Sequence, residues 1–384
     1  MPSQNAGAGP AAPGSDFSWV SAWAATLSPA SLFALGMVVV LIPGGGALLA
    51  LGAAVVVRLV LAAVMRQDAG ASEALLALPI AGAAALLVAV ADAFLLGTAV
   101  ARLAPALSPL PGAAAALLLA WRWLPGAGWV QAIAAVAVGA GVLGAAYFGL
   151  RLAVIGLPPA SSPPGLLDWV AAAGLAGVSL RGATSSFGRS TIARGVVAAV
   201  LTLGLGAVVI PTAGATFLAL SAASDHFSTR FLVLFLLLLI CITLLTLRRS
   251  LLEVAGFATA LARRGYLWRR LVVVESATGL PLTALNVATA AALLLLAALF
   301  ITGATNLFVV LAAAAQWTVI ALTCWRARDP SRLASPGVAL AAVAACFAIA
   351  PLLRYPAAGL LALALVAAVV LVARRAPGKA SPAS

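Results

Sequence analysis

Residues 77–100 read ALPIAGAAALLVAVADAFLLGTAV, a continuous apolar stretch in which Asp92 is the one charged residue. A helix needs about 20 mostly apolar residues to cross the hydrocarbon core of a bilayer. The stretch is long enough for that. It therefore predicts a transmembrane helix that carries an acid within the membrane.

The composition of the whole chain extends this prediction. Of the 384 residues, 64% are hydrophobic and 8% are charged, whereas about 25% of residues are charged in a soluble domain. A water-soluble enzyme is therefore excluded. About twelve spans would use roughly 240 residues and leave about 144 for loops and tails, too few for a folded domain outside the membrane. The function must lie within the helix bundle.

Apolar runs separated by Pro, Gly or charged residues divide the chain into spans. We predict an all-α polytopic membrane protein of about twelve transmembrane helices, with a single transmembrane domain over residues 19–373. Residues 1–18 are expected to form a disordered cytoplasmic tail, without the basic region and apolar core of a targeting peptide, and residues 374–384 a second cytoplasmic tail. The predicted spans lie near residues 19–43, 46–65, 77–100, 112–124, 129–150, 167–187, 195–220, 230–250, 280–301, 306–325, 336–352 and 356–373.

The basic residues predict the orientation. The chain has 22 Lys and Arg against 9 Asp and Glu, a net charge of +13, and such residues collect in cytoplasmic loops of membrane proteins. With the N-terminus inside, four arginines fall on the outer side: Arg102, Arg151, Arg230 and Arg354. Sixteen basic residues fall on the cytoplasmic side: Arg66, Arg122, Arg189, Arg194, Arg248, Arg249, Arg263, Arg264, Arg269, Arg270, Arg326, Arg328, Arg332, Arg374, Arg375 and Lys379.

This asymmetry favours an even number of spans with both termini inside. The Ala-, Leu- and Arg-rich composition indicates a high-GC bacterium, and hence the cytoplasmic (inner) membrane of a bacterium as the location. A long basic loop over 248–279 is expected to hold an amphipathic helix suited to anionic lipids. The Pro- and Ser-rich outer loop 151–167 separates the first five spans from the next five, which is compatible with inverted repeats.

Three segments carry a resemblance to a known family. Residues 260–296 (ALARRGYLWRRLVVVESATGLPLTALNVATAAALLLL) resemble the loop after the eighth span of the amino acid–polyamine–organocation permeases, where A-L-A-R-D-G-x-L-P-R precedes T-G-x-P and the next span. Residues 121–143 resemble the family's exit from span four and entry into span five. Residues 187–201 (FGRSTIARGVVAAVL) resemble its N-P-x-x-T-I-P-R-A segment after span six.

The resemblance implies a core of five plus five helices related as inverted repeats, as in leucine-transporter-type permeases. It also implies a secondary transporter of amino acids or related small amino-compounds, with the solute bound between the first and sixth spans. The chain departs from the family pattern in both spans. The G-x-G-I-F motif is absent from 34–52, where Pro43, Gly44 and Gly45 form either an alternative break or the turn between two spans. In 177–187 Gly182 remains, but the family's glutamate is missing.

Arg181 is the foremost candidate for binding a solute. It lies beside Gly182 and before Thr184, where a broken helix would expose backbone groups to a ligand, and its guanidinium would hold a carboxylate with two hydrogen bonds. The alternative is a continuous span in which Arg181 neutralises Asp92 or reaches the cytoplasmic surface. The candidate substrate-binding residues are Gly36, Pro43, Gly44, Gly45, Ser179, Arg181, Gly182 and Thr184.

Asp92 is a candidate for coupling transport to protons, because a desolvated carboxyl binds and releases a proton more readily near neutral pH. The alternative is a structural ion pair with Arg58 or Arg181. No metal, cofactor or nucleic acid is expected. Three scattered cysteines without a CxxC spacing and a single histidine, His226, offer no metal-ligand pattern.

Three classes of function remain to be weighed. A permease for small amino-compounds, driven by protons or exchange, has a solute and the lipid bilayer as its partners. A membrane-embedded enzyme would need acids or a histidine grouped at the membrane surface, and the nine acids are scattered singly. A transport-inactive, permease-like subunit or scaffold would have first and sixth spans that are continuous helices. The sequence favours the permease.

Overall fold

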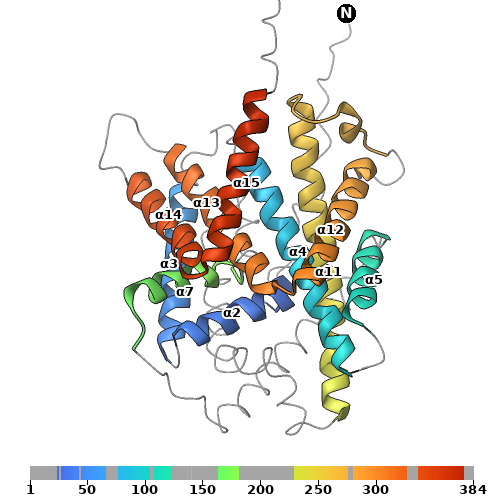
Figure 1. The fold of residues 1–384 in the computed structure, drawn as a ribbon, viewed down its shortest axis with the longest axis horizontal. Coiled ribbons are helices and arrows are strands. Elements are labelled where there is room, and N and C mark those ends of the chain that lie inside the picture. The colour runs from blue at the N-terminus through green and yellow to red at the C-terminus, as the bar shows by residue number, and fades with distance from the viewer. Residues whose placement is uncertain are drawn as a thin grey trace, which may run out of the picture.

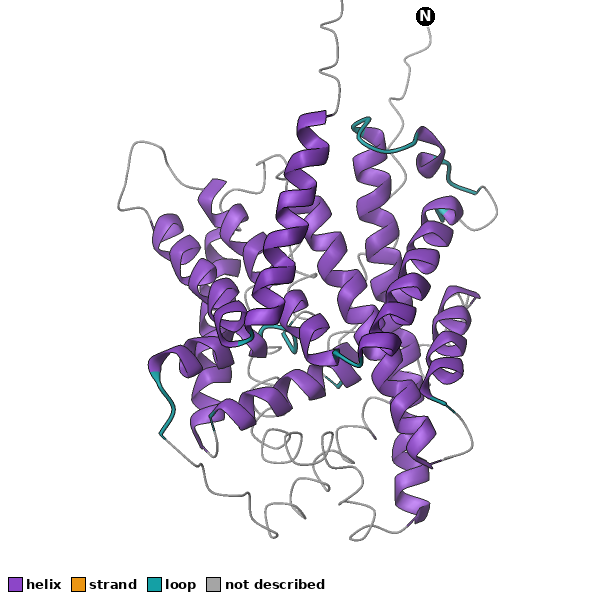
Figure 2. Cartoon of the chain, viewed as in Figure 1, coloured by secondary structure: helices purple, strands orange, loops and turns teal. Residues whose placement is uncertain are grey.

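Every regular element that the computed structural model describes is a helix (Figures 1 and 2). The prediction of an all-helical protein is confirmed for this part of the chain. The expected spans 129–150 and 195–220 lie outside the described residues, apart from Val136 and Ala140. The structure describes residues 24–25, 27–42, 45–65, 77–103, 108–122, 136, 140, 163–180, 229–275, 280–326 and 336–375.

Five of the described helices are long and apolar enough to cross a membrane, which supports a polytopic membrane protein but does not establish twelve spans. Their crossing segments are Ala77–Ala101 in α4 (Ala77–Leu103), Val233–Arg263 in α11 (Thr229–Arg263), Leu282–Thr302 in α12 (Leu282–Thr302), Thr305–Trp325 in α13 (Thr305–Arg326) and Gly337–Arg354 in α14 (Pro336–Arg354).

Helix α4 is the central element of the described bundle. It packs against α11, α12, α13 and the shorter α5 (Pro109–Arg122). Its buried positions are rich in alanine, including Ala84, Ala89 and Ala93, and small residues let helix backbones approach closely within a membrane. Helix α13 packs in turn against α14, and α15 (Pro356–Arg375) lies along both.

Helices α2 (Pro29–Leu41) and α7 (Leu166–Ala176) differ from the others in length and direction. They have 13 and 11 residues, or about 20 and 17 Å at 1.5 Å per residue, against a hydrocarbon core of about 30 Å. Both lie across the direction of α11 and α15 in Figure 1, and they pack against each other. The predicted spans 19–43 and 167–187 are therefore wrong as continuous helices over the described residues.

Local chemistry explains where these two helices end. Ser28 is the N-cap of α2, with its side chain accepting a hydrogen bond from the Ser31 amide and with Pro29 at the first helical position. After Ala176 the backbone bonds of α7 tighten to an i→i+3 pattern, as in the bond from the Val178 amide to the Leu175 carbonyl (3.1 Å). The chain then forms a turn over Gly177–Leu180, which we call the buried turn.

Helix α3 (Gly45–Met65) begins four residues after α2 ends at Leu41. Gly45 and Gly46 therefore belong to the first turn of α3. Pro43 and Gly44 lie between the two helices and outside the described residues.

Helix α11 is longer than the predicted span 230–250. It continues without interruption to Arg263, and an ion pair between Arg249 and Glu253 (Nε–Oε1 3.0 Å) links successive turns of the added segment. The expected amphipathic helix of the loop 248–279 is thus mostly the end of α11. It is followed by a turn at Gly265 and the short 3₁₀ helix η1 (Arg269–Val272).

Candidate functional site

The buried turn is the point at which several helices meet. Val178, Ser179 and Leu180 are each no more than 2% exposed. From α2, Ser31 Oγ lies 3.5 Å from the Val178 carbonyl oxygen. From α3, Arg58 Nη2 donates to the Gly177 carbonyl at 3.4 Å. The broken end of α7 is therefore held among polar groups inside the bundle.

A second polar cluster surrounds the N-terminus of α2. Asp92 of α4 is fully buried, and its Oδ1 accepts the Ala30 amide at 2.7 Å. Ser28 and Ser31 are also fully buried; the Ser31 hydroxyl donates to the Ala25 carbonyl at 2.6 Å. A carboxylate near the positive end of a helix dipole is favourable. Asp92 thus joins α4 to the first turn of α2, and Ser31 joins that turn to the buried turn.

Arg58 is the buried cation of this region. It is 6% exposed, and its guanidinium lies 4.8 Å from the centre of the Trp317 ring. Its Nη2 also donates to the Gln316 side-chain oxygen at 3.4 Å, while its Nε has no hydrogen-bond partner. No ion pair joins Arg58 to a carboxylate in the described part of the chain, so the alternative in which Asp92 pairs with Arg58 is not found there.

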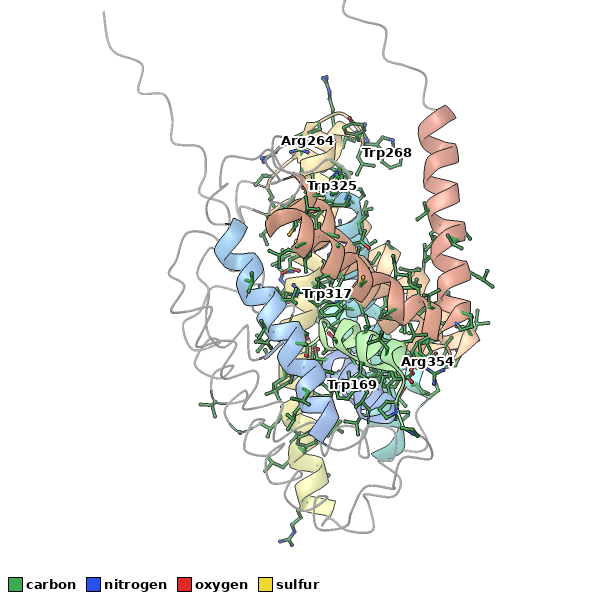
Figure 3. The ribbon with its side chains drawn as sticks, turned by 90° about the vertical axis from the view of Figure 1, so that its left-hand side faces the viewer. Trp169, Arg264, Trp268, Trp317, Trp325 and Arg354 are labelled. Atoms are coloured by element: carbon green, nitrogen blue, oxygen red, sulfur yellow. The ribbon has the colours of Figure 1, made fainter. Side chains whose placement is uncertain are left out.

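Trp317 of α13 packs against the buried turn. Its indole Nε1–H donates to the Gly174 carbonyl at 2.8 Å, and its ring meets Phe347 of α14 edge to face, with centroids 4.9 Å apart. A Cβ on Gly177 would overlap the indole nitrogen, so only glycine fits this approach of the buried turn to the ring. In Figure 3, Trp317 lies between Arg264 and Trp268 at one end and Arg354 and Trp169 at the other, nearer to the second pair.

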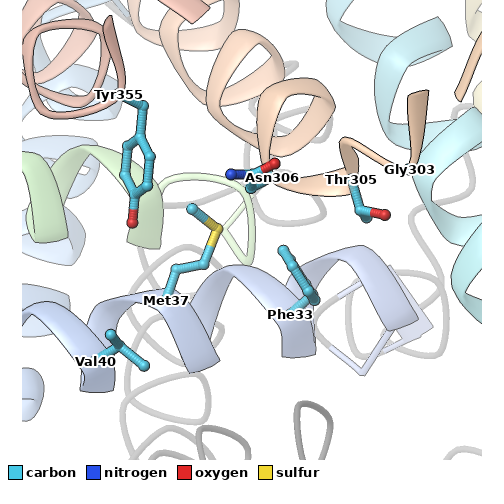
Figure 4. A pocket seen from close by; sticks show the side chains of 7 residues that line it. All are labelled: Phe33, Met37, Val40, Gly303, Thr305, Asn306 and Tyr355. Atoms are coloured by element: carbon cyan, nitrogen blue, oxygen red, sulfur yellow. The ribbon is translucent and has the colours of Figure 1, made fainter. Parts of the chain in front are cut away.

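An open pocket lies beside the other face of α2 (Figure 4). Its volume is about 390 Å³, and none of its lining residues is charged. The phenol of Tyr355 and the amide of Asn306 face the Met37 side chain across it in Figure 4. Gly303, in the left-handed conformation at φ 63°, makes the tight turn from α12 to α13 at its edge. The lining residues are Phe33, Met37, Val40, Gly303, Thr305, Asn306 and Tyr355.

Tyr355 lies at the corner between α14 and α15. Burial raises the pKa of its phenol above the ordinary value; neighbouring Arg354 lowers it and Asp168 raises it. Arg354 Nε and Asp168 Oδ1 form an ion pair at 2.8 Å, which links α14 to the start of α7. Arg354 is half exposed, so this pair contributes roughly 0.2–1 kcal/mol.

The predicted site residues are only partly described. Ser179 lies in the buried turn, with its hydroxyl donating to the Ala176 carbonyl at 2.7 Å. Asp92 does not contact the buried turn itself. It accepts the Ala30 amide at the start of α2, and Ser31 of the same helix contacts the turn. Gly36 is buried further along α2, and Gly45 is the first residue of α3. The remaining candidates, Pro43, Gly44, Arg181, Gly182 and Thr184, lie outside the described residues.

Sequence reasoning left four of these residues out of the site. Arg58 was recognised as a charge within a span but was given only a structural role. Ser31, Gln316 and Trp317 received none. The signal was available for the last two, since Gln316 and Trp317 interrupt an alanine-rich run in the middle of an expected span, where polar groups are costly.

The fold and the site define a helical membrane protein with a polar centre enclosed between two short helices. No protein-family model matches the chain, and no curated protein matches it significantly.

Proposed function

We propose that this protein is a secondary transporter for amino acids or related small amino-compounds. The solute is bound between the segments around α2 and α7, and alternating access exposes it to one side of the membrane at a time. The resemblance to the amino acid–polyamine–organocation permeases and a location in a bacterial inner membrane, with both termini inside, are parts of this proposal.

One observation carries it. The helices that stand in the first and sixth predicted spans are both too short to cross the bilayer, and Ser31 Oγ of α2 lies 3.5 Å from the Val178 carbonyl in the buried turn that follows α7. Broken helices that meet inside a bundle expose backbone groups and helix dipoles to a solute, which is how many transporters bind small charged molecules.

The alternative is a transport-inactive scaffold of the same architecture. That function has no need for broken helices or for polar groups in a dry interior, because each buried polar group must be compensated. Asp92, Ser28 and Ser31 are all fully buried around the start of α2. Continuous helices in both positions would have favoured the scaffold, so the short helices favour the transporter.

Uptake into liposomes tests the proposal. The purified full-length chain should accumulate at least one labelled amino acid, amine or small carboxylate above the level in protein-free liposomes. Ser31→Ala, which removes the hydroxyl between α2 and the buried turn, should lower uptake. The matched Thr302→Ala, at a hydroxyl bonded only within its own helix, should not. Inertness towards every solute would favour the scaffold.

The same assay tests proton coupling by Asp92. Asp92→Asn keeps an oxygen that can accept the Ala30 amide but cannot carry a proton on and off a carboxylate. If Asp92 couples transport to protons, accumulation driven by a pH gradient should be lost while exchange of solute across the membrane persists.

A further inference from the structure

Arg58 is a buried cation with weak hydrogen-bond partners among the described residues. Both of its hydrogen bonds come from Nη2 and are 3.4 Å long, whereas N–H···O bonds in proteins centre on about 2.9–3.0 Å. Its Nε has no partner, and no described carboxylate pairs with it. An uncompensated charge inside a membrane bundle is costly, so its retention calls for a reason.

Among the described residues, the groups in contact with the guanidinium are neutral. They are the Gly177 carbonyl, the Gln316 amide oxygen and the face of the Trp317 ring. The carbonyl lies just beyond the C-terminal end of α7, where the helix dipole favours a cation, and the ring adds a cation–π contact. These groups hold the guanidinium in place without neutralising it. Its charge and its Nε–H therefore remain available to an anion.

A second buried arginine in this chain gives a comparison. Arg248 of α11 is 7% exposed, and its Nη1 donates to the Trp121 carbonyl at 2.9 Å and to the Ala120 carbonyl at 3.4 Å, while its Nε and Nη2, like the Nε of Arg58, have no hydrogen-bond partner. These are carbonyls of the last turn of α5, so Arg248 caps that helix. Arg58 instead lies where three helices meet the buried turn, and neither of its hydrogen bonds is as short as the 2.9 Å bond of Arg248.

We infer that Arg58 binds the carboxylate of the solute, so that this protein selects carboxylate-bearing molecules over amines and polyamines that lack the group. The inference rests on the proposed function and narrows it to one substrate class. A guanidinium and a carboxylate form two parallel hydrogen bonds, which supply orientation as well as affinity. Sequence reasoning gave this role to Arg181; the described structure supports Arg58.

The binding experiment uses matched pairs of ligands. The full-length protein in detergent is heated with alanine or ethylamine, leucine or isoamylamine, and phenylalanine or phenethylamine, with acetate and benzoate as carboxylates without an amine. The acids should raise the melting temperature and the matched amines should not. In Arg58→Met the affinity for the acids should fall roughly 10- to 100-fold, the value of hydrogen bonds to a charged group.

Two further variants separate binding from folding. Arg58→Lys keeps the charge but loses the paired donors, and should also weaken acid binding. Arg248→Met removes the other buried arginine and should leave acid binding unchanged. Without ligand, Arg58→Met should be at least as stable as the wild type, because replacing a poorly compensated buried charge with an apolar side chain is often neutral or stabilising. A less stable Arg58→Met that still binds the acids would make Arg58 a structural residue and overturn the inference.

Uptake of the same ligands into liposomes distinguishes the inference from the proposed function. Transport of the amines as readily as the acids would overturn the role of Arg58 and leave the transporter intact. Acid binding that depends on Arg58 without uptake of any solute would support the anion site and reject transport. Neither binding nor uptake of any member of the panel would overturn both.

Discussion

At the scale of single residues, Tyr355 gives the chain a measurable dependence on pH. Burial raises the pKa of its phenol above the usual value of about 10, with Arg354 lowering it and Asp168 raising it. The folded chain therefore holds the phenolic proton more tightly than the unfolded chain. The stability that comes from this difference is complete below pH about 10 and is lost as the pH rises through the raised pKa.

Tyr355→Phe removes the ionisable group from this corner and so tests its contribution. The melting temperature of the full chain, followed from pH 8 to 11, should fall more steeply above pH about 10 for the wild type than for the variant. Tyr266→Phe, the same change at a side chain that is 62% exposed, serves as the matched substitution. A difference between the wild type and Tyr355→Phe that stays constant over the whole range would contradict the assignment.

At the scale of helices, the contact of α7 with α14 depends on Gly174, which has no side chain. A Cβ on Gly174 would overlap the Phe347 carbonyl oxygen and the Pro351 ring. Gly174→Ala should therefore force the two helices apart and destabilise the protein by about 1–3 kcal/mol. Gly52 and Gly256 also lie within helices, but a Cβ there meets nothing within 4 Å. Their replacement by alanine should leave the thermal unfolding temperature unchanged or higher. A similar loss of stability in all three variants would contradict the role of the contact between α7 and α14, because it would follow from replacing any glycine within a helix.

How accurately the sequence predicts the bounds of a helix depends on what determines where that helix ends. For α4, the predicted span 77–100 and the helix Ala77–Leu103 nearly coincide, because apolar length alone decides a membrane span. For α2 and α7 the same rule fails. Their ends depend on the Ser28 cap, on Pro29 and on contacts from distant helices, such as that of Trp317 with Gly174. Hydropathy contains no information about such contacts, whereas Gln316 and Trp317 stand out in the sequence because they interrupt an alanine-rich run in mid-span.

At the scale of the whole molecule, two contacts join distant residues that we expect on the same side of the membrane. The ion pair of Arg354 with Asp168 joins two residues that are both expected on the outer side. At the other end, Trp121 Nε1 donates to Asn286 Oδ1 at 2.8 Å, and both residues are expected on the inner side. Arg264, Trp268 and Trp325 gather at one end of the bundle, away from Arg354 and Trp169 (Figure 3). These pairs agree with an even number of crossings between Asp168 and Arg354.

Labelling of single cysteines tests which end faces the cytoplasm. In a background with Cys241, Cys324 and Cys346 replaced by serine, cysteine is introduced at Leu166, which is 81% exposed at the start of α7, or at Tyr266, beyond the end of α11. Because basic loops stay inside, a membrane-impermeant maleimide added to intact cells should label Leu166→Cys alone. Tyr266→Cys should react only after the membrane is permeabilised. Labelling of both from outside would mean that the two positions share a side and that the crossings were miscounted, whereas the reverse pattern would invert the whole orientation and leave the helix bundle as described.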